Sequence, residues 1–85
     1  MYFDPAQLRY CGNRSGMAIF RYQGICVTAS VSSAYGSRSI AVGVGAAMPN
    51  TVLPGLLSWF GVDTRRSVDT VRYMDNSRCY IQRAA

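Results

Sequence analysis

The feature that most constrains the fold is a stretch without any charged residue between Arg38 and Asp63. It reads SIAVGVGAAMPNTVLPGLLSWFGV, which is long for a chain of 85 residues. A membrane-spanning helix needs about 20 consecutive apolar residues in one helical segment. Here Gly and Pro recur, and Met48-Pro49-Asn50 interrupts the pattern. We therefore expect the strand, turn and helix of a soluble core, and no membrane span.

The two halves of this stretch have different periodicities. Ile40, Val42 and Val44 alternate with small residues, which predicts a strand. After Thr51 the apolar residues recur at helical spacing and form a single stripe, which consists of Leu53, Leu56, Leu57 and Phe60. Thr51 can cap the start of this helix, and Gly61 fits just past its end.

The preceding segment predicts a β-hairpin. Met17–Tyr22 and Ile25–Ser32 have strand-like patterns, and Gln23-Gly24 forms a two-residue turn between them. Pairing the two residues next to this turn puts the apolar side chains on one face, and a slip of one residue would mix the faces. The apolar face is Ala18, Phe20, Tyr22, Ile25, Val27, Ala29 and Val31, and the polar face is Arg21, Thr28, Ser30 and Ser32.

The two ends of the chain predict two further elements. Asp4-Pro5 is typical of a helix start, and Gly12-Asn13 would end that short helix. Residues 68–74 and 78–82 predict a second hairpin. Its turn falls at Asp75-Asn76 or at Asn76-Ser77, and the sequence leaves both registers open.

Together these elements predict a single α+β domain over residues 1–85. We expect a small antiparallel sheet of about five strands in two hairpins, one main helix packed on one face, and a short N-terminal helix.

The composition removes most catalytic chemistry. The chain has no His, Lys or Glu. It therefore lacks the commonest general base and metal ligand, and the amine of Schiff-base catalysis. The four aspartates are far apart in sequence. We expect no enzyme, no catalytic residue, no metal and no cofactor.

The cysteines and the N-terminus bear on the compartment. Cys11, Cys26 and Cys79 lack the spacing of a metal or redox motif. One disulfide is possible, but three reduced thiols in a cytoplasmic protein is the favoured reading. The N-terminal residues show no signal-peptide pattern.

Recognition by Arg and Tyr is the chemistry that remains. The net charge is +5 and there are six tyrosines. A basic chain favours anionic partners, and both residue types are enriched at binding hot spots. The predicted contact set lies on or beside the second hairpin: Arg65, Arg66, Arg72, Tyr73, Arg78 and Tyr80. Alternatively, these residues are a solvated rim.

Three functions are compatible with this pattern. The first is an inhibitor or adaptor that binds an acidic protein surface. The second is a binder that sequesters nucleotides or nucleic acid, and the third is a membrane-active protein that uses residues 39–62. A thinly covered sheet also favours a homo-oligomer.

In its general character the chain resembles the small phage-encoded anti-defence proteins, of the anti-CRISPR or nucleotide-sponge type. The resemblance concerns length, an α+β fold and the lack of catalytic residues, and no specific motif carries it. It implies a non-enzymatic, often oligomeric inhibitor of a host defence complex in the cytoplasm of the host cell. Because the chain is basic, such an inhibitor would cover an acidic patch or bind an anionic ligand.

Overall fold

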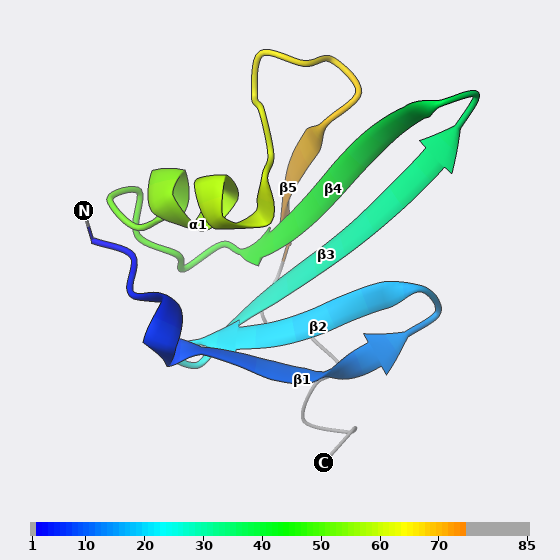
Figure 1. The fold of residues 1–85 in the computed structure, drawn as a ribbon. Helices are drawn as coiled ribbons and strands as arrows, with labels where there is room; N and C mark the ends of the chain where they lie inside the picture. The colour runs from blue at the N-terminus through cyan, green and yellow to red at the C-terminus, as the bar shows by residue number, and fades with distance from the viewer. Residues whose placement is uncertain (1, 75–85) are drawn as a thin grey trace.

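The computed structural model describes residues 2–74 as one five-stranded sheet with one α-helix (Figure 1). The second strand expected for the C-terminal hairpin, residues 78–82, lies outside this range. The strands are ordered β1-β2-β3-β4-β5 across the sheet. The elements are η1 (Pro5–Gln7), β1 (Leu8–Arg14), β2 (Met17–Tyr22), β3 (Ile25–Ala34), β4 (Ser37–Gly45), α1 (Leu53–Phe60) and β5 (Thr70–Met74).

Strands β1 to β4 form an antiparallel meander with two-residue turns. The turns are Ser15-Gly16, Gln23-Gly24 and Tyr35-Gly36, and both residues of each have positive φ, 52 to 54° at the first and 78 to 79° at the glycine. This is the type I′ geometry, whose twist matches that of the flanking strands. The predicted β2–β3 hairpin is confirmed, including the pairing of Tyr22 with Ile25.

The predicted N-terminal helix is wrong beyond its first turn. Asp4 caps as expected, since its Oδ1 accepts a hydrogen bond from the Ala6 amide at 3.1 Å, but only the 3-10 turn η1 follows. The chain then enters β1, because pairing with β2 satisfies a whole row of backbone groups. Gly12, expected to end the helix, lies inside β1, where its φ of 123° accompanies a β-bulge.

Strand β5 is parallel to β4, so the sheet is only mostly antiparallel. Thr70 lies beside Ala41 and Met74 lies beside Gly45. Helix α1 and the following loop carry the chain back along the sheet before β5 begins (Figure 1). The expected strand at residues 68–74 therefore exists, but β4 is its neighbour among residues 2–74.

Residues of α1 share one buried cluster with residues of the sheet. Leu56 and Leu57 belong to it together with Val27, Val42 and Val44. The rings of Phe20 and Phe60 meet edge to face, with 5.1 Å between their centroids. Burial of this apolar area is the main favourable contribution to folding.

The ends of α1 agree only in part with expectation. Gly61 ends the helix in the left-handed conformation with φ of 79°, as predicted. Thr51 does not cap its start: the N-cap residue is Val52, and no side chain bonds there. The Pro49 carbonyl instead accepts from the Val52 and Leu53 amides at 3.0 and 3.3 Å.

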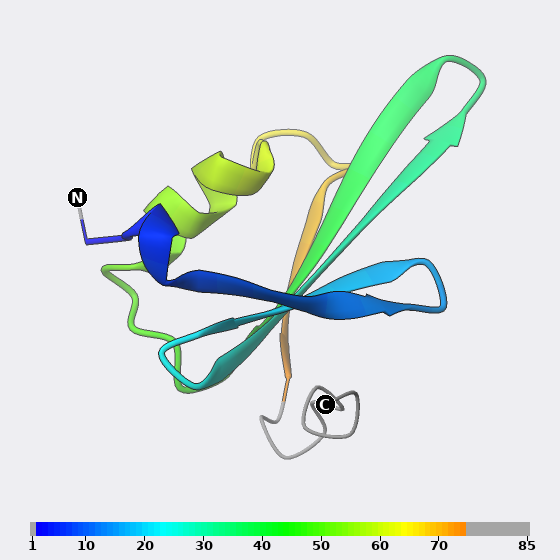
Figure 2. The same cartoon turned by 60° about the horizontal axis from the view of Figure 1, so that its bottom comes forward.

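The β3–β4 hairpin extends past the rest of the sheet (Figures 1 and 2). We call its outer part, residues 31–38, the arm. All of these residues are exposed, and Tyr35 stands at the tip. In residues 2–74, no helix is long and apolar enough to cross a membrane.

Candidate binding face

The structure does not bring the predicted contact set together. Arg65 is exposed in the loop after α1 and pairs with Asp63 at 3.2 Å. Arg66 donates from Nη2 to the Arg38 carbonyl at 2.8 Å, which ties the loop to β4. These two arginines therefore have local structural roles.

The other members of the predicted set are separated as well. Arg72 and Tyr73 are neighbours on β5 and so lie on opposite faces of the sheet. Tyr73 pairs with Val44, a core residue, and is half-exposed. Arg78 and Tyr80 lie outside the described residues.

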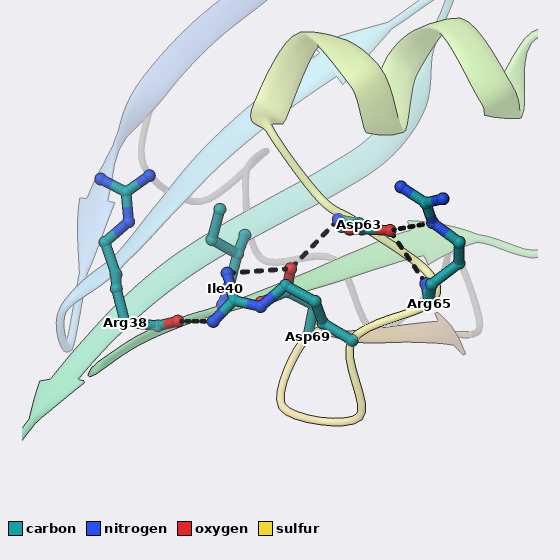
Figure 3. Close-up of polar contacts among 6 residues, drawn as sticks. Arg38, Ile40, Asp63, Arg65 and Asp69 are labelled. Carbon is teal, nitrogen blue, oxygen red and sulfur yellow. Dashed lines mark hydrogen bonds and ion pairs between the residues drawn. The ribbon is translucent and has the colours of Figure 1, made fainter.

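Asp69 organises the loop that holds Arg66 (Figure 3). Its side chain is fully buried; Oδ2 accepts from the Asp63 amide at 3.1 Å and Oδ1 from the Ile40 amide at 2.9 Å. Arg66 lies 3.9 Å away. The two amide bonds, with that of Asp63 first, lower the pKa of Asp69 below its usual value. The Asp69 carboxylate thus ties the loop to β4 as a charged hydrogen-bond acceptor.

Sheet register places arginines from three strands on the face opposite the core residues Val27, Val42 and Val44. Arg9 pairs with Arg21, which pairs with Cys26. Arg72 lies beside Gly43, which pairs with Thr28. Paired residues share a face, and so do residues two apart on a strand. Arg9, Arg21 and Arg72 therefore project from the same side.

The β-bulge in β1 adds a fourth arginine to this side. Without it, Arg9 and Arg14 would face opposite ways, because they are five positions apart and side chains alternate along a strand. The pairing skips Cys11, so that Arg14 pairs with Met17 while Arg9 still pairs with Arg21. We call the face that carries Arg9, Arg14, Arg21 and Arg72 the arginine face.

The middle of the arginine face is shallow, with small residues between longer side chains at its rim. A hollow of about 330 Å³ lies there, and its lining is Met17, Thr28, Ser30, Ala41, Val42, Gly43, Thr70, Arg72 and Met74. A Cβ on Gly43 would come within 2.5 Å of Thr28 Oγ1. A flat surface with three hydroxyl side chains and an arginine suits docking more than enclosure of a substrate.

No aspartate of residues 2–74 belongs to the arginine face. Asp4 caps η1, and Asp63 pairs with Arg65. Asp69 accepts from the amides of Ile40 and Asp63. Within the same residues, no three His, Cys, Asp or Glu side chains are grouped as metal ligands. With strands about 4.8 Å apart, Arg9 on β1 and Arg72 on β5 are about 19 Å apart across the sheet. The arginines of this face therefore span a width comparable to that of a protein interface.

The aromatic residues lie mainly on the other side of the sheet. Tyr22 is 1% exposed, its ring stacks on Phe3 with 5.2 Å between centroids, and its hydroxyl accepts from the Asp4 amide at 3.0 Å. Tyr10 packs on Phe20, with a centroid distance of 5.4 Å. Tyr10 and Tyr22, neither of them in the predicted contact set, thus take part in the aromatic packing of the fold.

The cysteines differ from expectation. Cys26 is almost fully buried and disulfide-bonded, and Cys11 is a half-buried free thiol. The prediction of three reduced thiols is therefore wrong. Cys26 also packs with Ile19 in a second, smaller buried cluster on the arginine face, beside Cys11 and Met74.

The arginine face was missed because β1 was taken for a helix. The Ser15-Gly16 pair that joins β1 to β2 has the same X-Gly pattern as Gln23-Gly24, which the sequence did identify as a turn. That signal could have predicted β1 and placed Arg9 and Arg14 on the sheet.

Comparisons with protein-family models, curated proteins and solved structures found no match.

Proposed function

We propose that this chain is a non-enzymatic binding protein that occupies an acidic surface of a partner protein and thereby inhibits or sequesters it. The observation that carries the proposal is the arginine face, on which the sheet register gathers four arginines from three strands. In this proposal α1 packs on one face of the sheet and the partner contacts arginines of the other.

The physical basis is charge complementarity. Guanidinium groups form bidentate, charge-assisted bonds with carboxylates, and they lose less hydration than lysine does. A patch of one sign also accelerates encounter with an oppositely charged partner, and this acceleration weakens as salt increases. Small residues between the arginines allow close approach of a partner backbone.

We extend the proposal to the partner class that the general resemblance implies. That class is a host defence complex, and the chain would act in the cytoplasm of the host cell as a phage-encoded inhibitor of the anti-CRISPR type. The disulfide at Cys26 weighs against the cytoplasmic location, because disulfides persist mainly in oxidising compartments.

A nucleotide or nucleic acid is the second candidate ligand, bound by a monomer or a homo-oligomer. The hollow favours it, since the hydroxyls of Thr28, Ser30 and Thr70 lie near Arg72 and could bind a phosphate. Binders of single strands also stack bases on aromatic rings. The described residues of the arginine face include no aromatic side chain, so we favour the acidic protein.

Affinity capture from the organism that expresses the chain, read by mass spectrometry, tests the proposal. The matched variants are Arg72→Ser on the arginine face and Arg65→Ser in the exposed loop, which remove the same charge. We expect an acidic protein that Arg65→Ser retains and that Arg72→Ser loses by about tenfold, as for a hot-spot arginine. Equal retention by both variants would refute the role of the face. Tight binding of an oligonucleotide or a cyclic dinucleotide, measured directly, would select the second candidate.

A further inference from the structure

The two outer edges of the arm are protected differently. On β4, pairing with β5 begins at Ala41, so the backbone groups of Arg38 and Ile40 point away from β3 with no strand beside them. Side chains bind both: Arg66 donates to the Arg38 carbonyl at 2.8 Å, and Asp69 accepts from the Ile40 amide at 2.9 Å (Figure 3). The β4 edge is thus closed to another strand.

On β3, pairing with β2 ends at Ala29, opposite Ala18. Beyond it, β3 continues to Ala34, which pairs with Ser37 next to the type I′ turn. That closing pair is hydrogen-bonded, and bonding alternates along an antiparallel ladder. The outward N–H and C=O groups beyond Ala29 are therefore those of Val31 and Ser33, and no residue of 2–74 pairs with them.

This second edge also lacks the usual protection. Natural edge strands carry charged residues, proline or a bulge that prevents pairing with another chain. Residues 30–34 read SVSSA, without any of these features. Val31 is 58% exposed. The same hairpin thus has one edge closed by an arginine and an aspartate and another edge left open.

We propose that the open edge of β3 binds an extended acidic segment of the partner protein as an additional β-strand. Backbone groups of that segment would bond to Val31 and Ser33, as in other cases of strand addition. Ser32 lies on the arginine face, two residues after Ser30. The added strand therefore extends this face, and alternate side chains of the segment turn toward the side on which Arg72 shares the hollow with Ser30. This inference rests on the proposed function.

A second copy of this chain fits the edge less well. Two copies each carry a net charge of +5 and repel one another. Antiparallel pairing about Ser32 would also supply only four backbone hydrogen bonds, with no charge attraction added to them to offset the lost freedom of two molecules. A partner already docked on the arginine face makes the same bonds within one complex, where the effective concentration of the segment is high.

A displayed library of random 12-residue linear peptides, selected on the full chain, tests the inference. We expect the enriched peptides to be rich in Asp and Glu. Synthetic versions are then N-methylated at one residue at a time, which removes one N–H. We expect at least a tenfold loss of affinity at alternate positions and little change at the positions between them. Loss at successive positions, or no excess of acidic residues, would overturn the inference.

Two variants of the chain complete the test. Val31→Pro removes an outward N–H, which an edge strand tolerates, and Val31→Thr keeps it. We expect Val31→Pro to weaken peptide binding at least tenfold and Val31→Thr to leave it near the original. If Arg72→Ser weakens binding while Val31→Pro does not, strand addition fails and the proposed function stands. A dimer in sedimentation that Val31→Pro abolishes would assign the edge to a second copy and overturn the inference.

Discussion

Gly43 of β4 pairs with Thr28 of β3 on the arginine face, and its replacement tests the register of the sheet. A Cβ at this position would lie 2.5 Å from Thr28 Oγ1, well inside van der Waals contact, so the Thr28 side chain or one of the two strands has to shift. Overpacking of this kind costs about 1–3 kcal/mol. Alanine recovers about 0.5–1 kcal/mol of backbone entropy relative to glycine.

Gly43→Ala should therefore destabilise the protein by roughly 1 kcal/mol, a fall in Tm of about 4–8 °C for a domain of this size. Urea unfolding gives the free energy directly. In the double variant with Thr28→Ala the clash is absent, and we expect a coupling energy of about 1 kcal/mol between the two sites. A Gly43→Ala variant as stable as the original, or additive effects of the two changes, would refute the register that defines the arginine face.

Two other changes test the polar contacts. Tyr22→Phe removes the hydroxyl that binds the Asp4 amide, and we expect a loss of about 1 kcal/mol in urea unfolding; an unchanged stability would mean that this contact does not hold the N-terminal segment. Asp69→Asn keeps one acceptor for the amides of Ile40 and Asp63 and loses the charge. The pKa of Asp69 is lowered in the folded state, so its stabilisation is present above the unfolded pKa of about 3.9 and is lost as the pH falls through the folded value. The Tm difference between this variant and the original should be largest at pH 7 and shrink below about pH 4, and a constant difference would contradict the ionised role.

The β2–β3 hairpin could be predicted because its determinants are local. Gln23-Gly24 supplies the two positive φ values of the turn, and the alternation on either side fixes the register. Helix α1 was predicted for the same reason, since its apolar stripe and Gly61 lie within one segment. The charge-free stretch between Arg38 and Asp63 supplies much of the buried core, which explains why it lacks charged residues.

The other elements depend on partners that are distant in sequence. Propensity alone does not show that residues 8–14 pair with β2, so Asp4-Pro5 suggested a helix. The parallel placement of β5 depends on how α1 returns the chain to β4. Arg66 looked available for a ligand because the carbonyl it binds, that of Arg38, is 28 residues away in the chain. The arginine face is a product of register and one bulge, which composition does not reveal.

The salt dependence of binding to the captured partner tests the central claim most directly. The affinity of the original chain is measured by calorimetry from low to physiological ionic strength, beside Arg72→Ser and Arg65→Ser. We predict that affinity falls as salt rises, that Arg72→Ser binds about tenfold more weakly with a reduced dependence on salt, and that Arg65→Ser behaves as the original. An affinity that is insensitive to salt, or an equal loss in both variants, would contradict binding through the arginine face.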